Sequence, residues 1–261
     1  MTRKRAVDAK ESTDNKFARW KARFKAVTGA FEQGKLTEAR TLLYKSSLEA
    51  EGLQDKDYAV PVCNIGMAII SMEQGKPDEA KQFFDKGLNS ISHKSDPASR
   101  EMYAAGLIFK AIWHERQGDL TEAERCLKES VDVLKDLGAD AAVQLAYSLS
   151  DLGFILARTD RIDEAEPLVM AAMEILSATV GRDDATYDWA KMIYQACANS
   201  SDDAMLAETF EYSVTKLQYK VGAHHPNLTR ALNIYAAGLK KRGMTDRLKQ
   251  AEKSFSALLQ Q

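Results

Sequence analysis

The chain has 261 residues, of which 45% are hydrophobic and 28% are charged, an ordinary composition for a protein with a sizeable buried core. Its 36 Lys and Arg against 38 Asp and Glu leave a net charge of −2, which argues against nucleic acid as a partner, because nucleic-acid binders usually carry a basic excess. No apolar run approaches the roughly 18 residues of a membrane span, and the charged start lacks the apolar stretch of a signal peptide. We therefore expect a cytoplasmic protein with no membrane partner.

Residues 1–15, "MTRKRAVDAKESTDN", come first in the chain and are expected to form a flexible basic and polar tail. The alternative use of this tail is as a basic anchor for a partner. From residue 16 onward apolar residues recur at helical spacing, and the alternation typical of strands is missing. The sequence therefore predicts an all-α protein over residues 16–261.

One motif returns four times between the predicted helices. Its copies are "QGKLTEARTLL" at 33–43, "QGKPDEAKQFF" at 74–84, "QGDLTEAERCL" at 117–127 and "TDRIDEAEPLV" at 159–169. Their turn residues are Gly34, Gly75, Gly118 and Asp160, spaced by 41, 43 and 42 residues, and the same rhythm continues to Ser201 and Gly243. Glycine ends a helix sharply because it accepts the left-handed backbone conformation. The repeat therefore predicts six turns, each joining two antiparallel helices.

A Thr or Asp three residues after the turn is expected to cap the second helix of each hairpin through its side-chain oxygen. The expected caps are Thr37, Asp78, Thr121, Asp163 and Asp246, and Thr121 with Glu124 and Asp163 with Glu166 complete capping boxes. If Asp163 caps its helix, Pro167 falls at the end of the first turn and forgoes at most one backbone hydrogen bond. Two residues beyond each of the first four caps stands a small Ala, where two helices are expected to cross closely.

The hairpin "LSDLGFILARTDRIDEAEPLVMAAMEIL", residues 149–176, resembles the tetratricopeptide repeat family. The long period and the segments "DEAEPL" and "VGAHHPNLTRALNIYA" are similar to the repeats of kinesin light chain. The resemblance implies a right-handed superhelical solenoid of about six antiparallel helix hairpins over residues 16–261. The last helix, in "DRLKQAEKSFSALLQQ", would cap the array, or would form a dimer interface if its apolar face is exposed.

In this family the first helix of each hairpin lines a concave face on which partners lie. The resemblance therefore implies that side chains near the ends of the first helices meet a partner. The expected contact residues are Ile65, Ile108, Ile112, Arg116, Phe154, Arg158, Lys191, Arg230, Asn233, Lys240 and Lys241. Apolar residues gather toward the first repeats and cations toward the last, which suits a peptide with apolar anchors and acidic groups. In the alternatives, these residues only pack between helices or face solvent, or the groove holds the chain's own tail or a second copy.

Other chemistry is not indicated by the sequence. Cys63, Cys126 and Cys197 lie far apart within helical patterns and are expected to be buried thiols in a reducing compartment. Neighbouring His224 and His225 cannot easily converge on one metal ion, and the following Pro226 is expected to open a helix. Phosphate-loop, metalloprotease and nucleophile-elbow motifs are missing from the sequence. We expect no cofactor, no metal and no catalytic site.

The sequence thus predicts a non-catalytic scaffold that binds a peptide segment of a protein partner. Two alternatives stay open, a ligand-responsive regulator and an accessory subunit of an enzyme complex. The expected assembly is a monomer, or a homodimer formed through a terminal helix.

Overall fold

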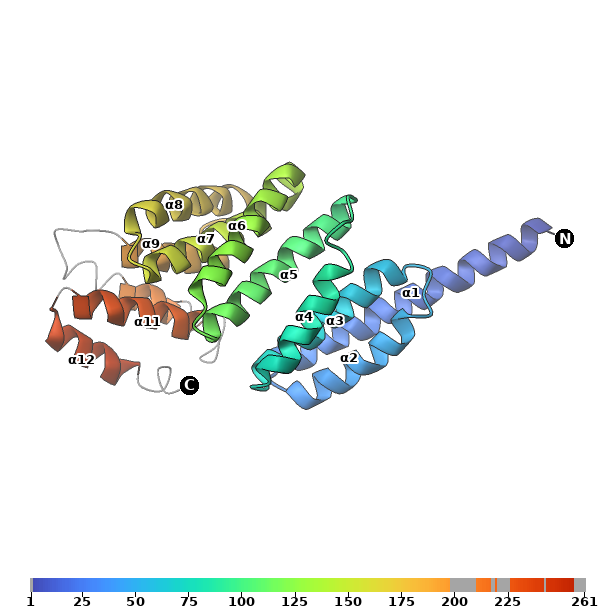
Figure 1. The fold of residues 1–261 in the computed structure, drawn as a ribbon, viewed down its shortest axis with the longest axis horizontal. Coiled ribbons are helices and arrows are strands. Elements are labelled where there is room, and N and C mark those ends of the chain that lie inside the picture. The colour runs from blue at the N-terminus through green and yellow to red at the C-terminus, as the bar shows by residue number, and fades with distance from the viewer. Residues whose placement is uncertain (1, 198–209, 217–218, 220–225, 242, 256–261) are drawn as a thin grey trace. The chain divides into compact units, whose positions relative to one another are not determined.

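The computed structural model describes residues 2–197, 210–216, 219, 226–241 and 243–255. Within these ranges the chain forms α-helices, one short 3-10 helix and turns, and no β-strand, as the all-α prediction requires (Figure 1). The chain divides into two compact units, Met1–Asp119 and Leu120–Gln261. None of the helices in the described part of the chain is long and apolar enough to cross a membrane.

The first unit consists of two helical hairpins and a further helix. Its helices are α1 (Thr2–Glu32), α2 (Leu36–Ala50), α3 (Lys56–Glu73), α4 (Pro77–Asn89) and α5 (Pro97–Arg116). The core between α1, α2 and α3 contains Trp20, whose indole N–H donates a hydrogen bond to the backbone oxygen of Ser46 at 3.1 Å. Leu43 of α2 meets α3 at Gly66, where an added Cβ would lie 3.0 Å from a Leu43 methyl carbon. A residue without a side chain at this point lets the two hairpins approach closely.

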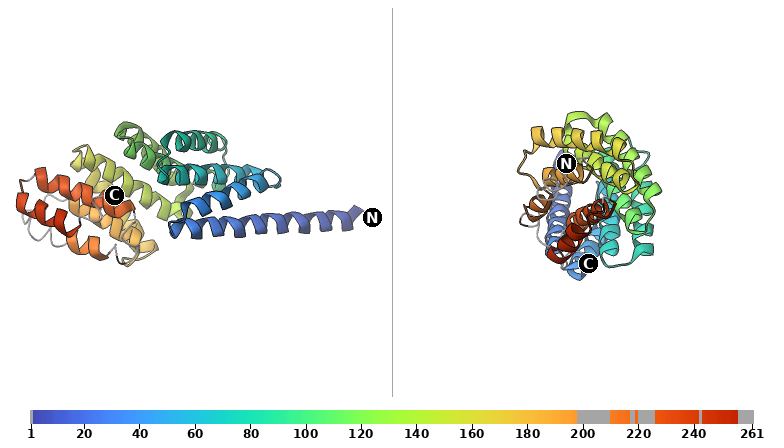
Figure 2. Two further views of the ribbon diagram at one scale, coloured as in Figure 1. Left: turned by 90° about the horizontal axis from the view of Figure 1, so that it is seen from below. Right: turned by 90° about the vertical axis from the view of Figure 1, so that its left-hand side faces the viewer.

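Helix α1 has 31 residues and its hairpin partner α2 has 15. The amino-terminal part of α1 therefore projects beyond α2 (Figure 2). The helical backbone includes residues 2–15, which the sequence predicted to be a flexible tail, and this flexibility stays a prediction.

The second unit repeats the helical hairpin. Its elements are α6 (Leu120–Leu137), the 3-10 helix η1 (Gly138–Ala141), α7 (Ala142–Arg158), α8 (Ile162–Thr179), α9 (Ala185–Cys197), α11 (Pro226–Lys241) and α12 (Thr245–Ser254). Helices α7 and α8 cross where Gly153 faces Val169, and an added Cβ there would overlap the Val169 side chain and lie 3.3 Å from the backbone oxygen of Ala165. Ala165 is itself fully buried, as are its equivalents Ala39, Ala80 and Ala123. Ala165 therefore confirms the prediction that a small residue marks a close helix crossing, and its three equivalents are buried as a crossing would require.

The predicted turns lie where the repeat placed them, apart from Ser201, which falls outside the described residues. Gly34, Gly75, Gly118 and Gly243 have φ values of 71°, 69°, 81° and 71°, and Asp160 adopts the same left-handed conformation at 64°. At the first turn the Gly34 N–H donates to the oxygen of Phe31 at 2.8 Å, and the Lys35 N–H donates to that of Ala30 at 2.9 Å. This pair of bonds is the Schellman motif, which satisfies the last carbonyl groups of a helix.

The predicted helix caps are wrong. Helices α2, α4, α6, α8 and α12 begin at Leu36, Pro77, Leu120, Ile162 and Thr245, so that Thr37, Asp78, Thr121, Asp163 and Asp246 are each the second residue of a helix. The cap positions of α2, α4, α8 and α12 belong to Lys35, Lys76, Arg161 and Met244, whose side chains make no capping hydrogen bond. The physical reason is that each of these helices begins two residues after its left-handed turn residue, so the cap position falls directly after the turn residue and the Thr or Asp falls inside the helix. An acidic residue in the first helical turn still benefits from the positive helix end.

Pro167 lies two residues deeper in its helix than the sequence suggested. Because α8 begins at Ile162, Pro167 is its sixth residue, and its missing N–H leaves the carbonyl of Asp163 without an intrahelical partner. The helix continues to Thr179, so this proline does not end it. In α3, Pro61 occupies the same sixth position.

Candidate functional site

Four predicted contact residues of the first unit lie on α3 and α5, of which three are isoleucines and the fourth is Arg116. Ile65 is 7% exposed and packs inside the unit, where an added Cβ on Gly106 would lie 2.9 Å from its Cδ1 atom. We therefore remove Ile65 from the candidate surface, because its side chain fills the space that Gly106 leaves. Ile108 and Ile112 of α5 are half-buried.

Arg116 lies at the carboxyl end of α5 and pairs with Glu73 at the end of α3, with 2.8 Å between Arg116 Nη2 and Glu73 Oε1. Both residues stand two positions before a repeat turn. One helical turn earlier, Ile69 of α3 and Ile112 of α5 are half-buried and occupy equivalent positions. The first unit therefore presents half-buried isoleucines beside an ion pair. We call Ile69, Ile108 and Ile112 the apolar face.

Sequence reasoning missed one exposed aromatic on this helix. Phe109 of α5 is 37% exposed, although the helical pattern placed it outside the expected contact positions. The available signal was a large aromatic residue directly after Ile108, where the equivalent residue of α3 is Gly66.

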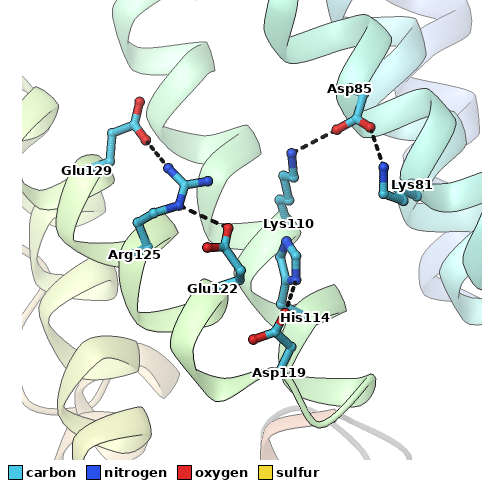
Figure 3. A network of polar contacts seen from close by, with 8 residues as sticks. All are labelled: Lys81, Asp85, Lys110, His114, Asp119, Glu122, Arg125 and Glu129. Carbon is cyan, nitrogen blue, oxygen red and sulfur yellow. Dashed lines mark hydrogen bonds and ion pairs between the residues drawn. The ribbon is translucent and has the colours of Figure 1, made fainter.

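The second helices carry ion pairs that tie elements together (Figure 3). In the first unit, Asp85 of α4 accepts hydrogen bonds from Lys81 at 3.0 Å and from Lys110 of α5 at 2.8 Å. Burial would raise the pKa of Asp85, but the two lysines outweigh it and hold the pKa below its ordinary value. In the second unit, Arg125 of α6 bonds to Glu122 at 2.9 Å and to Glu129 at 3.3 Å. These contacts join neighbouring turns of one helix or neighbouring helices of one unit.

Two predicted contact residues of the second unit form part of its interior. Arg230 of α11 is 8% exposed, and its guanidinium group pairs with Asp151 of α7 at 3.0 Å. The same guanidinium group lies 4.3 Å from the ring centre of Phe154 and 5.0 Å from that of Trp189. The Trp189 N–H donates to Asp151 at 3.2 Å, and Phe154 is 1% exposed. Arg230 and Phe154 therefore hold α7, α9 and α11 together, and we remove both from the candidate surface.

A second buried carboxylate lies on α9. Asp188, whose side chain is 3% exposed, pairs with Lys216 at 3.2 Å. Tyr147 on α7 is half-buried, and its partial loss of solvation, followed by the charges of Asp151 and Asp184, raises the pKa of its hydroxyl to about 12. Asp151 and Asp188 thus each receive a cation from a later segment of the chain, which is the usual condition for burying a carboxylate.

The remaining predicted cations and amide of the second unit reach solvent. Arg158 of α7 is exposed, with its guanidinium carbon 5.9 Å from the Phe154 ring centre, and Lys191 of α9 is half-buried. Asn233 and Lys240 of α11 are exposed. The side chain of Lys241 lies outside the described part of the structure. We call Arg158, Lys191, Asn233 and Lys240 the basic face.

The described residues offer little for metal or thiol chemistry. No group of three His, Cys, Asp or Glu side chains that could hold a metal ion occurs among them. Cys63 and Cys126 are buried free thiols, as predicted, and burial raises the pKa of Cys63 to about 12, which keeps this thiol protonated. Pro226 opens α11, which confirms its predicted place, whereas Cys197, His224 and His225 have no described side chains.

Comparison with known proteins identifies the repeat and the fold. Residues 102–178 match the family model for the tetratricopeptide repeat. The chain is similar to a crystal structure of nearly identical TPR-like repeats from Podosopora anserina, described as a kinesin light chain, at 15% identity and a TM-score of 0.57, over 77% of this chain and 96% of that one. It is also similar to pilF of Pseudomonas aeruginosa at 14% identity and a TM-score of 0.53, over 94% of each chain. A comparison with curated proteins finds no match. At these identities the solved structures show a shared all-α helical-repeat fold.

Proposed function

Residues 102–178 are tetratricopeptide repeats within an all-α helical-repeat chain, and from this premise we propose that the protein is a non-catalytic scaffold that binds peptide segments of protein partners. Partners would lie on the side lined by the first helices of the hairpins. The observation that carries the proposal is the basic face, because its polar side chains remain accessible while the neighbouring Arg230 is buried in a structural pair. Exposed cations on a repeat scaffold suit recognition of carboxylates.

The two units would contribute different chemistry to recognition. On the first unit, the apolar face offers half-buried isoleucines that a partner's aliphatic or aromatic side chains can cover. On the second unit, Lys191 and Lys240 would pair with Asp or Glu, and the exposed amide of Asn233 would bond to the partner's backbone. An apolar partner segment therefore suits the face of the first unit, and an acidic partner segment suits the face of the second.

The buried titratable groups support a scaffold rather than a catalyst. Asp151 and Asp188 are each engaged by a cation, and the Cys63 thiol is kept protonated. Free buried thiols also support the proposed cytoplasmic location, since reducing compartments preserve them.

A charge-reversal pull-down tests the proposal. The full chain serves as bait, and the same experiment is repeated with Lys191→Glu and Lys240→Glu together. We expect the proteins that the unaltered chain captures to be reduced about tenfold or more, because two attractive contacts become repulsive. Ile112→Ser tests the apolar face in the same way, through loss of buried apolar area.

Lys135→Glu with Lys249→Glu is the matched control, since these exposed lysines lie on the second helices α6 and α12 and carry the same charge change. The basic face is supported as a binding surface if the control captures the same proteins as the unaltered chain and the Lys191 and Lys240 variant does not. Equal capture by all forms would contradict it.

A further inference from the structure

Helix α1 differs from the remainder of the chain in its charge. It contains nine Lys and Arg against four Asp and Glu, whereas the other residues contain 27 against 34. Between Lys16 and Phe31 the helix has five cations and no acidic residue. Helix α1 therefore has a net charge of +5, whereas the remainder of the chain has a net charge of −7.

The cations of α1 from Lys16 to Lys25 have no acidic residue at helical contact spacing within the helix. Arg19, Lys21 and Lys25 have no Asp or Glu three or four residues away on either side, which are the spacings at which helical side chains meet. All three are exposed, as is Lys16. Arg23 does pair with Glu49 of α2, at 2.5 Å. We call Lys16, Arg19, Lys21 and Lys25 the α1 basic face.

The apolar residues of the same helix point into the protein. Trp20 is 2% exposed, and its ring stacks on Phe17 and Phe24 with centroid separations of 5.6 and 5.5 Å. The exposed residues between the cations are the small Ala18, Ala22 and Ala26. A helix that binds at a membrane surface needs an apolar face to insert, and the aromatic residues of α1 are already used in the core.

The equivalent positions of the next hairpin show what kind of partner this face would accept. Gly66 of α3 stands nine residues before its turn and packs on Leu43 of the preceding hairpin. The residue nine positions before the turn in α1 is Lys25, and the residue in α1 that corresponds to the partly buried Val62 is Lys21. Where α3 accepts an apolar surface, α1 offers two ammonium groups. A partner surface that complements α1 at these positions is therefore acidic.

We propose that the α1 basic face is a second docking surface that binds an acidic helical segment of a protein partner. The small alanines allow a partner helix to approach closely, and its Glu or Asp side chains would pair with the flanking cations. A long polyanion such as nucleic acid fits less well, because it would extend past α1 to a remainder that carries 34 acidic against 27 basic residues. The surface lies on the first unit and is independent of the basic face on the second.

The test uses the full chain and a fluorescent helix-forming peptide of roughly 18 Glu, Ala and Leu residues. Binding is followed by anisotropy at low and at physiological salt. We expect the peptide to bind, with an affinity that falls as the salt concentration rises. The counterpart with Gln in place of Glu should not bind. The variant Arg19→Glu, Lys21→Glu, Lys25→Glu should weaken binding of the acidic peptide about tenfold or more. Circular dichroism should show unchanged helix content, since these side chains are exposed.

Two controls separate this surface from the proposed groove. Lys45→Glu, Lys86→Glu, Lys135→Glu makes the same charge change at exposed positions of second helices and should leave binding unchanged. Lys191→Glu with Lys240→Glu removes what the basic face of the second unit contributes to peptide binding, and the three α1 changes should still weaken binding about tenfold when they are made in this variant. If that variant loses the peptide and the α1 variant retains it, the inference is overturned while the groove gains support.

Three other results would also overturn the inference. One is no binding by the unaltered chain, which would leave the α1 cations a role in solubility alone. Another is tighter binding, through the same residues, of a duplex DNA of similar length or of phosphatidylserine vesicles. The third is self-association of the chain that the α1 variant abolishes, measured by sedimentation.

Discussion

At the scale of single residues, Arg230 shows how a cation can be mistaken for part of a binding surface. Its type and position suggested a carboxylate partner, and it has one, but that partner is Asp151 of the same chain, 79 residues earlier. The flat guanidinium group lies against the rings of both Phe154 and Trp189 while it holds the buried carboxylate. The residue type correctly indicated that Arg230 pairs with a carboxylate. It did not indicate that this carboxylate belongs to the same chain.

This arrangement predicts that Arg230→Met strongly destabilises the chain. The variant leaves Asp151 buried without its cation, which typically costs about 3–5 kcal/mol. Adding Asp151→Asn should recover part of the loss, because a neutral amide needs no counter-charge and its oxygen can still accept from Trp189. Urea unfolding of the full-length variants measures the effect.

Arg158→Met is the matched comparison, because Arg158 lies near the same Phe154 ring but is exposed. Its loss should cost about 1 kcal/mol or less. If the two arginine variants lose similar amounts of stability, the buried pair with Asp151 is not the reason that Arg230 stabilises the fold.

At the scale of elements, hairpin geometry depends on glycines with different surroundings. Gly153 sits where α7 crosses α8, with Val169 and the backbone of Ala165 close by. Gly29 lies in α1 with open space around it. Both glycines lie within helices, so helix propensity alone treats them alike.

Gly153→Ala and Gly29→Ala are therefore expected to act in opposite directions. At Gly153 the new methyl group overlaps Val169 and should cost about 1–3 kcal/mol through overpacking. At Gly29 the same change should stabilise by about 0.5–1 kcal/mol, because alanine loses less conformational freedom in a helix. Thermal unfolding followed by circular dichroism compares them.

Val169→Ala in the Gly153→Ala background should relieve the overlap and recover part of the lost thermal unfolding temperature. Destabilisation by both glycine variants, or no rescue by the second change, would contradict this account of the crossing.

At the scale of the whole molecule, the sequence predicted the repeat rhythm better than the surface. A turn glycine has a local signature, and five of the six predicted turn residues are described and adopt left-handed backbone conformations. The caps were mispredicted because the exact start of a helix depends on how tightly the preceding turn closes. Ile65 and Phe154 could not be assigned from periodicity, since their burial depends on Gly106 and Arg230, which belong to other helices. That the hairpins form one continuous array stays a prediction.

Both units contain carboxylates whose pKa is held below the ordinary value. Hydrogen bonding from Arg40, at 2.5 Å, lowers the pKa of Glu79 in the first unit. In the second unit burial would raise the pKa of Glu124, but hydrogen bonds from Lys128 and Arg161 outweigh it. A lowered folded-state pKa adds stability above the unfolded value, and this stability is lost as the pH falls through the folded value.

The molecule should therefore lose stability on acidification, beginning near the ordinary Glu pKa of 4.5 and continuing below it. Glu124→Gln tests one contribution. At pH 7 it should lower stability by about 0.5–1 kcal/mol, a value that allows for solvent screening of the partly exposed Arg161. At a pH well below 4.5, once the pH has fallen through the lowered pKa of Glu124 in the unaltered chain, the difference should shrink. Glu174→Gln, at an exposed position of α8, is the control and should change stability little at either pH. Urea unfolding at both pH values measures these differences, and a Glu124→Gln deficit that persists undiminished in acid would rule out the ion pair as its source.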